Sequence, residues 1–513
     1  MPEELRNPLL KGFYPDPSIC RVGDDFYMVT SSFSYFPGVP IFHSRDLINW
    51  RQIGHVLDRP SQLPLRYHAI SGGIYAPTIR YHDGLFYMIT TNVSCGGNFI
   101  VTAEKPEGPW SEPHWIAGAG GIDPSLFWDD DGRVYYTGTS WSNESGIWLY
   151  EIDMKEFRLK SGPTVVWRGA LRDCWAPEAP HLYKKDGWYY LMIAEGGTED
   201  YHAVTIARSR SVKGPYKGYE GNPILTHRHL GLDYPISNVG HGDLVQLSDG
   251  RWYMVMLASR IYGGYHKNMG RETFIAPVDW SGDWPVVSPG TGKVEWTYPA
   301  PLPQDPAFAP APPSPRQDFA SLDFNTLGTP DNAPYRIENG KLRLRYLPHC
   351  FTPGRQDETL PGAMAFLGRR QQHMSFRASV RVRAPQTAGA SCGLILLQND
   401  FCQLRLELLK EESGVTLRAC KASKTERSGR AAEETLAALP CAESAVTLTI
   451  AAEGQDIRLL YDGTEIAAAN GGFLGSESAG GFVGAYVGPF ASGNGRELPG
   501  EAVIDWMEYE GKE

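Results

Sequence analysis

Short segments in which apolar residues run together or alternate with polar residues recur along the first 300 residues of the chain. Five of them are FYMVTSS, FYMITTN, VYYTGTS, YYLMIAE and WYMVML. They are rich in β-branched and aromatic residues, and turns of Gly, Asp and Asn separate them, which is typical of β-strands joined by hairpins. Apolar positions spaced for a long helix are nearly absent. The pattern predicts an all-β fold.

A hairpin signal repeats within the same region. Asp-Gly-x-x-Tyr ends at Tyr87, Tyr135, Tyr190 and Tyr253, and a weaker copy ends at Tyr27. Successive tyrosines are 60, 48, 55 and 63 residues apart. A period near 50 with several strands in each unit predicts a β-propeller, and five copies predict five blades around a central channel in residues 1–298. The alternative is a chance set of Asp-Gly turns in an unrelated β protein.

The pattern changes twice after the last repeat. Residues 299–315 read PAPLPQDPAFAPAPPSP, which is too rich in proline for a regular helix or a central strand and predicts an extended surface linker. From 316 to 513 apolar and polar residues alternate again, as in KLRLRYL, SFRASVRVR and AVTLTIAA. This alternating pattern predicts a C-terminal antiparallel β-sandwich. The region contains few clusters of acidic residues, so we do not expect the catalytic residues to lie there.

Charge and cysteine usage narrow the class of protein. The chain of 513 residues has 59 acidic and 48 basic side chains, a net charge of -11, which argues against nucleic acid or an anionic membrane as partner. The first residues show no secretory signal, and no apolar run reaches transmembrane length. Eight cysteines are scattered without a CxxC pair, as expected of reduced thiols. We therefore expect a cytoplasmic protein that acts on a neutral ligand.

Five residues hold one position in the repeats. Asp123 and Glu178 lie 12 residues before their signature tyrosines and Asp16 lies 11 before its own, while Tyr75 and His241 hold the offset of 12 in the other two copies. Residues that lead into the innermost strand of each blade line one mouth of the channel. The five side chains are therefore predicted to form a ring, and converging carboxylates favour acid–base chemistry.

Glycosidic bond hydrolysis is a reaction that such a ring suits. One carboxyl group must be protonated to assist the leaving oxygen, and another must be ionised to activate water or attack directly. Repulsion among Asp16, Asp123 and Glu178 is expected to raise the pKa of one of them and leave the others charged. Asp16 and Asp123 each precede proline and have turn formation as an alternative role. Glu178, within WAPEAP, has apolar neighbours of the kind that keep a carboxyl protonated.

Other chemical motifs are weak. The sequence contains no HExxH, P-loop or GxSxG pattern. His241 alone makes a poor metal site, so we assign no metal ligand and favour a hydrogen-bonded or ligand-facing role for this residue. Arg271 has two open roles, a surface pairing with an acid or a reach into the ring to hold a carboxylate or a sugar hydroxyl.

Seven ordered motifs resemble a known family over nearly the whole chain. They are NPLLKGFYPDPSI, GGIYAPTIRY, GIDPSLFWDDDG, WAPEAPHLY, AEGGT, NVGHGDLV and GRETFIAPV. The chain resembles glycoside hydrolase family 43, in its β-xylosidase-like branch. The resemblance implies a five-bladed propeller with an inverting mechanism, in which Asp16 is the general base and Glu178 the general acid. It further implies that Asp123 holds the acid in position and keeps its pKa raised.

The same resemblance implies residues around the bound sugar. They are Phe33, Trp141, Thr198, His241 and Arg271. Tyr75 stands where the family often has tryptophan, which leaves the preference for xylose over arabinose open. Phe482 is a candidate for the sandwich aromatic that helps to close the pocket in similar enzymes.

The expected activity is exo-acting removal of terminal β-D-xylose from short xylo-oligosaccharides. An α-L-arabinofuranosidase, or an enzyme with both activities, is the nearest alternative, and a non-catalytic glycan-binding propeller is a more distant one. A structural scaffold would require a broad apolar outer face, of which the sequence gives no sign. No cofactor is expected to be required. A calcium ion near His241, which some relatives use, and a homo-oligomer stay open.

Overall fold

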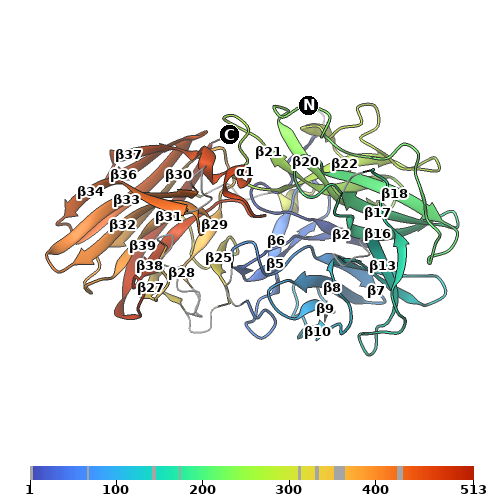
Figure 1. Cartoon of the computed structure of the whole chain (residues 1–513), viewed down its shortest axis with the longest axis horizontal. Helices are drawn as coiled ribbons and strands as arrows, with labels where there is room; N and C mark the ends of the chain where they lie inside the picture. The colour runs from blue at the N-terminus through green and yellow to red at the C-terminus, as the bar shows by residue number, and fades with distance from the viewer. Residues whose placement is uncertain are drawn as a thin grey trace.

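The protein consists of two β-rich lobes (Figure 1). The computed structural model describes residues 4–65, 69–140, 146–172, 175–309, 314–329, 334–351, 364–424 and 431–512. Within these ranges the regular structure is almost entirely β, with one four-residue helix, α1 (Ser476–Ala479), and two 3-10 turns, η1 (Pro306–Phe308) and η2 (Gly471–Leu474). The all-β prediction is confirmed. In the described ranges no helix has the length and apolar character needed to cross a membrane.

The N-terminal lobe is a five-bladed β-propeller, as predicted. Blade 1 contains β2 (Ser18–Val22), β3 (Asp25–Val29), β5 (Gly38–Ser44) and β6 (Arg51–Leu57); blade 2 contains β7 (Thr78–His82), β8 (Leu85–Asn92), β9 (Gly97–Ala103) and β10 (His114–Trp115). Blade 3 contains β11 (Ile122–Trp128), β12 (Val134–Ser140), β13 (Gly146–Asp153), β14 (Arg158–Leu159) and β15 (Thr164–Trp167). Blade 4 contains β16 (Glu178–Lys185), β17 (Trp188–Glu195), β18 (Ala203–Ser209) and β19 (Lys217–Gly218). Blade 5 contains β20 (Ile236–Gln246), β21 (Trp252–Arg260), β22 (Glu272–Asp279) and β23 (Val286–Val287), and β1 (Glu4–Arg6) pairs with β24 (Thr297–Pro299).

The Asp-Gly signals are tight hairpins between the first two strands of a blade. In blade 2 the pair His82–Leu85 encloses Asp83 and Gly84, which both have positive φ, and blade 4 repeats the arrangement at Asp186 and Gly187. Two central residues with positive φ define the turn whose twist matches paired antiparallel strands. This local chemistry is the reason that the repeat is readable in the sequence.

The innermost strands close into a ring around the axis. Strand β2 contacts β7 and β20, β11 contacts β7 and β16, and β16 contacts β20. One buried ion pair links two of these strands below the mouth of the channel: Arg80 on β7 binds Asp243 on β20 at 2.8 Å. Asp243 also accepts from the hydroxyls of Ser18 and Tyr183, from β2 and β16. A buried carboxylate with this many donors remains ionised, and the ion pair together with the two hydroxyls ties four blades together.

The C-terminal lobe is a sandwich of two antiparallel sheets, which confirms the second prediction. One sheet has the order β26 (Tyr335–Glu338), β27 (Lys341–Tyr346), β39 (Leu498–Lys512), β30 (Ser375–Arg383), β35 (Ala445–Glu453), β36 (Asp456–Tyr461) and β37 (Thr464–Asn470). The other has the order β34 (Ala431–Cys441), β33 (Gly414–Lys424), β32 (Cys402–Glu411), β31 (Ser391–Asn399), β38 (Tyr486–Ser492), β29 (Gly368–Arg370), β25 (Phe324–Leu327) and β4 (Tyr35–Phe36), with β28 (Ala365–Phe366) beside β38. Their inner faces bury a common apolar core that includes Val380, Leu394, Leu406 and Leu448.

The two lobes are joined by more than the proline-rich segment. Strand β4 belongs to the propeller segment of the chain, yet it pairs with β25 at the edge of a sandwich sheet. Arg370 is buried at the joint, where it donates to the carbonyl oxygen of Phe13 at 2.7 Å and lies over the ring of Tyr14. An apolar cluster that includes Phe13 and Tyr486 crosses the same boundary. The sandwich is therefore held firmly at one rim of the propeller.

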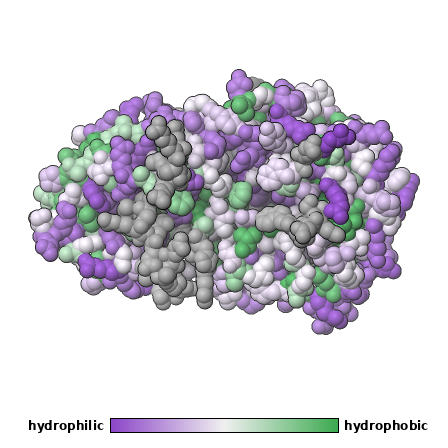
Figure 2. All heavy atoms as spheres, viewed as in Figure 1, coloured by the Kyte–Doolittle hydropathy of each residue, from purple (hydrophilic) through white to green (hydrophobic). Residues whose placement is uncertain are grey.

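Among the described residues on the face turned to the viewer, Figure 2 shows no broad apolar patch. Figure 2 shows hydrophobic residues in small groups among hydrophilic and intermediate ones on the face turned to the viewer. This distribution is ordinary for a globular protein. On this face, therefore, nothing favours the scaffold alternative.

Candidate active site

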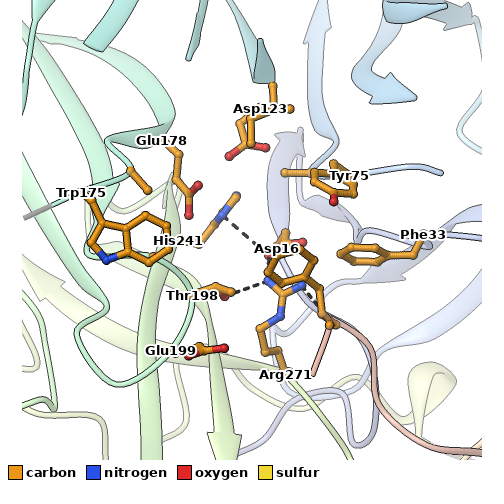
Figure 3. A pocket seen from close by; sticks show the side chains of 16 residues that line it. Asp16, Phe33, Tyr75, Asp123, Trp175, Glu178, Thr198, Glu199, His241 and Arg271 are labelled. Atoms are coloured by element: carbon orange, nitrogen blue, oxygen red, sulfur yellow. Dashed lines mark hydrogen bonds and ion pairs between the residues drawn. The ribbon is translucent and has the colours of Figure 1, made fainter. Parts of the chain in front are cut away.

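The five residues that share one repeat position line a single cavity. Asp16, Tyr75, Asp123, Glu178 and His241 all border a cavity of about 580 Å3 at the mouth of the channel. Figure 3 shows their side chains directed toward a common space from five blades. The structure thus brings together the ring that the repeat offset predicts.

Four further sequence candidates border the same cavity, namely Phe33, Thr198, Arg271 and Phe482. Trp141 lies outside the described residues. The remaining lining residues are Ala76, Ile122, Trp175, Ala176, Gly197, Glu199 and Gly481. The cavity therefore combines four carboxyl groups with several aromatic rings.

The backbone at the ring has an unusual conformation that aims the side chains inward. Asp16, Asp123 and His241 have φ of 56°, 54° and 48°, in the left-handed region that non-glycine residues seldom adopt. The pairing of the first strand with the second is interrupted at Asp123, beside Glu178 and around His241 by shifts in register. Such bulges commonly redirect a side chain next to an active site.

Asp16 is held as a carboxylate. It is buried, and its Oδ1 lies 2.7 Å from Nη1 of Arg271, while its Oδ2 accepts the hydroxyl of Ser31 at 2.5 Å. Nδ1 of His241 lies 3.7 Å from the same Oδ1. Burial is the largest effect on Asp16 and raises its pKa, but the charge of Arg271, the neighbouring His241 and the hydrogen bond from Ser31 together outweigh burial and bring the pKa below its ordinary value. Asp16 is therefore ionised at neutral pH.

Glu178 has the opposite character. Burial raises its pKa from an ordinary value near 4.5 to about 7, and the negative charge of Asp16 adds to the effect. Burial also raises the pKa of Asp123 well above its ordinary value, with Glu178 and Asp16 as further causes. Since the two carboxyl groups interact strongly, they titrate as a pair that retains a proton near neutral pH.

The proton of this pair is better placed on Glu178. Asp123 accepts a hydrogen bond from the backbone N–H of Ala179 at 3.2 Å, and that bond favours the ionised form of Asp123. The prediction that repulsion raises the pKa of one acid alone is wrong, because two are raised. The reason is that burial, the largest effect on both Asp123 and Glu178, is offset only weakly by Arg271 there, whereas Asp16 contacts Arg271 directly.

His241 is held as a neutral ring. It is buried, and burial lowers its pKa despite the opposing charge of Asp16. A neutral imidazole supplies one donor and one acceptor rather than a positive charge. It lies between the acids, beside Asp16 and within 4.8 Å of ligand atoms of Asp123 and Glu178. His241 therefore faces the cavity, as the sequence favours.

Arg271 reaches the ring and is not a surface residue. Besides Asp16, its guanidinium binds the hydroxyl of Thr198 at 3.0 Å and the carbonyl oxygen of Phe482 at 3.1 Å. It also lies over the ring of Phe33, 5.6 Å from the centroid. One side chain, directly before strand β22 of blade 5, thereby positions an acid, a blade 4 loop and the sandwich.

The sandwich contributes part of the cavity wall. The N–H of Phe482 donates to the hydroxyl of Ser71 at 2.9 Å, and Arg271 holds the carbonyl oxygen of the same residue. The ring of Phe482 lies 6.3 Å from that of Phe33 and 6.1 Å from that of Tyr75. The two lobes therefore build one pocket, with Phe482 in the position that the resemblance implies.

Comparison with known proteins identifies the family. The model of glycosyl hydrolases family 43 matches residues 5–285. The chain belongs to this family. The model of the β-xylosidase C-terminal concanavalin A-like domain matches residues 316–510. The protein is therefore a glycoside hydrolase with the fold and the accessory domain that its sequence resembles.

Several relatives of this family 43 enzyme match nearly its full length. It is 44% identical over 509 residues to a xylosidase/arabinosidase of Butyrivibrio fibrisolvens, covering 96% of each chain. It is 37% identical to the non-reducing end α-L-arabinofuranosidase BoGH43B of Bacteroides ovatus, covering 98% of this chain and 94% of the relative. Among solved structures, the GH43B protein of the B. ovatus xyloglucan locus has a TM-score of 0.90 at 36% identity, covering 99% and 100% of the two chains. A xylan β-1,4-xylosidase of Bacillus halodurans C-125 has a TM-score of 0.88 at 32% identity with the same coverage.

The ring of this family 43 enzyme fits calcium poorly as a direct ligand set. Asp123, Glu178 and His241 offer ligand atoms within 4.8 Å of one another. Calcium takes six to eight oxygen ligands, whereas this group supplies one nitrogen and two carboxyl groups. The raised pKa of both acids also means that the pair retains a proton where a cation needs full ionisation. No catalytic step is therefore assigned to a metal.

Sequence reasoning missed three contributors to the site of this family 43 enzyme. Ser31 binds Asp16, and Trp175 and Glu199 line the mouth. Two of them could have been found from the sequence, because Trp175 is the first residue of the WAPEAP motif and Glu199 directly follows the AEGGT motif. Ser31 lies at the end of an ordinary strand segment, and nothing in its neighbours distinguishes it.

Proposed function

We propose that this family 43 enzyme is an inverting exo-glycosidase that removes terminal β-D-xylose from short xylo-oligosaccharides. The observation that carries the proposal is the opposite protonation of two acids in one cavity. Asp16 is ionised beside Arg271, and Glu178 holds a proton near neutral pH. A pair of carboxyl groups with separated pKa values is what glycoside hydrolysis requires.

The chemical step follows from these two states. Asp16 removes a proton from a water molecule, whose oxygen forms a bond to the anomeric carbon. On the other face of the sugar the bond to the leaving oxygen breaks, and Glu178 donates its proton to that oxygen. The product has the opposite anomeric configuration. Because a water must fit between base and sugar, we expect the carboxyl groups of Asp16 and Glu178 to lie about 6.5–9.5 Å apart.

The other residues of the cavity are assigned positioning and binding roles. Asp123 orients the segment of Glu178 through the N–H of Ala179 and forms with Glu178 the pair that retains the proton. Phe33, Tyr75 and Phe482 offer ring faces to the first sugar, while Thr198, His241 and Arg271 offer polar groups to its hydroxyls. The walls that Phe482 and Gly481 add at one rim favour a pocket, and a pocket suits removal of single terminal sugars.

An α-L-arabinofuranosidase, alone or combined with xylosidase activity, is the second candidate. Tyr75 favours it, because this ring is smaller than the tryptophan common in the family. The Tyr75 hydroxyl donates to the carbonyl oxygen of Ser71 at 3.2 Å, which leaves its ring to shape the wall. Relatives with names of both kinds match nearly the full length of the chain.

Product analysis on paired substrates tests the proposal. We expect a higher kcat/KM on 4-nitrophenyl β-D-xyloside than on the α-L-arabinofuranoside, and release of α-xylose from xylobiose as the first product seen by NMR. Rates should be equal with and without EDTA, since no step uses a metal. First release of β-xylose would overturn the inverting mechanism, and a preference for the arabinofuranoside would favour the second candidate. If the protein bound pentosides but hydrolysed none of them, the result would support the non-catalytic glycan-binding alternative.

We also propose a cytoplasmic location and leave self-association as a prediction. The cysteines that the structure describes, Cys20, Cys95, Cys350, Cys392, Cys402, Cys420 and Cys441, are free, which suits a reducing compartment. Short oligosaccharides are the substrates that such a compartment receives. Activity found mainly outside the cells of the source organism would contradict the location, and light scattering in solution would test for a homo-oligomer.

A further inference from the structure

Trp175 is exposed at the mouth of the cavity. Its exposed fraction is 66%, the largest of the described tryptophans, although it lines the same cavity as the acids. A large apolar ring at a polar rim is left in water only at a cost, and such exposure commonly marks a binding surface. No step of the proposed mechanism uses this side chain.

The indole is backed by the polypeptide on one side. Gly197 has a positive φ of 69°, and a Cβ at that position would lie 2.4 Å from Cζ2 of Trp175. The ring therefore lies directly against a residue that has no side chain. The carbonyl oxygen of Trp175 also accepts the N–H of Gly196 at 2.8 Å. The ring is supported from behind and offers its remaining surface to the solvent.

Trp175 lies on the acid side of the cavity. Figure 3 shows Trp175 and Glu178 together at one side, while Phe33 and Tyr75 lie at the other side near Asp16. Trp175 lies only three positions before Glu178 in the chain, so the same segment carries both. The aromatic rings of the cavity thus form two separate groups.

The position of the general acid implies that the two groups of aromatic rings contact different sugars of the substrate. Glu178 must reach the oxygen that joins the terminal sugar to the rest of the substrate. The departing sugar therefore leaves along the wall next to Glu178, and the terminal sugar occupies the space nearer Asp16. Phe33, Tyr75 and Phe482 border that inner space.

We propose that Trp175 is the platform on which the departing sugar of the substrate stacks. This inference rests on the proposed function, because it needs a glycoside that Glu178 protonates. The C–H face of a pyranose fits the electron-rich face of an indole. A rigid ring loses little conformational freedom on binding, so Trp175 makes oligosaccharides better substrates than glycosides with a small leaving group.

Two substrates that share the terminal sugar test this assignment. Xylobiose places a sugar on Trp175, whereas methyl β-D-xyloside needs the same proton from Glu178 but leaves only methanol. We expect Trp175→Ala to lower kcat/KM on xylobiose about tenfold, as the loss of one stacking contact implies. On methyl β-D-xyloside we expect less than a twofold change, and Trp175→Phe should retain most of the xylobiose activity.

Trp115→Ala is the matched control. Trp115 is also partly exposed, at 38%, and lies against a glycine, Gly96, where a Cβ would be 2.4 Å from its ring. It sits on β10, the outermost strand of blade 2, away from the cavity. This variant should leave both rates unchanged, which excludes a general effect of losing an exposed tryptophan.

The remaining outcomes overturn the assignment. Equal losses on both substrates, or a displaced alkaline limb of the pH profile, would show that Trp175 supports Glu178 rather than the departing sugar. Unchanged rates on both would show that the ring binds nothing during turnover. If the wild-type protein hydrolyses neither substrate, the proposed function has failed instead. If it prefers arabinofuranosides, the same pair of variants is compared on a disaccharide and a methyl glycoside of that sugar.

Discussion

Replacing Asp16 with asparagine should lower kcat about 10²–10⁴-fold, the range that general base catalysis contributes. Asparagine keeps the size of the side chain and an oxygen that accepts from Arg271, but it cannot take a proton from water. The ionised state of Asp16 depends on the guanidinium at 2.7 Å, so the wild-type base is active even in mild acid. Steady-state kinetics on xylobiose measures the loss.

The stability of this variant separates a catalytic role from a structural one. The backbone at residue 16 has φ of 56°, which asparagine tolerates better than alanine. The substitution weakens the contact with Arg271 but also relieves repulsion among three acids, so we expect a loss of at most about 1–3 kcal/mol in the free energy of unfolding. Asp186→Asn, in an exposed turn with φ of 51°, is the matched control. An unfolded Asp16→Asn protein beside a folded control would mean that Asp16 serves the fold.

Replacing Glu178 with glutamine should lower kcat/KM on xylobiose by a similar factor, about 10²–10⁴-fold. Glutamine preserves the shape and most hydrogen bonding, but it has no proton to donate to the leaving oxygen. The kcat/KM on a substrate whose leaving group departs without protonation should therefore fall much less. Parallel assays on xylobiose and 2,4-dinitrophenyl β-D-xyloside measure the difference, and the variant should still bind xylose.

The dependence of the rate on pH tests the role of Glu178 independently. The pKa of Asp16 lies below its ordinary value and that of Glu178 is about 7. The rate should fall in acid as Asp16 becomes protonated, and it should fall above about pH 7 as the pair with Asp123 loses its proton. In Glu178→Gln the alkaline limb should disappear. If both substrates lost activity equally and the limb remained, another group would be the acid.

Much of the propeller could be predicted because its information is local. Each Asp-Gly turn at positive φ determines a hairpin within a few residues, as at Asp83 and Asp186. The repetition of such hairpins reveals the number of blades. The acids were found for the same reason, since a fixed offset from the hairpin places a residue at the same point of every blade.

The electrostatic assignment could not be read in this way. Asp16 and Arg271 are separated by 255 residues, and the pKa of Asp16 depends on their approach to 2.7 Å. Repeat position alone treats the three acids as equivalent, and the expectation that repulsion among them raises one pKa is wrong, because burial raises two. The closing of blade 5 against blade 1 differentiates them.

The sequence by itself determined the all-β class, the five blades, the sandwich and the convergence of Asp16, Asp123 and Glu178, because strand periodicity and turn chemistry are properties of neighbouring residues. The tertiary structure alone decided what keeps Asp16 charged, which of its two open roles Arg271 takes, and where Trp175 stands. These features depend on distances between segments far apart in the chain. Burial and charge act through space, and a linear pattern does not record which segments the fold brings together.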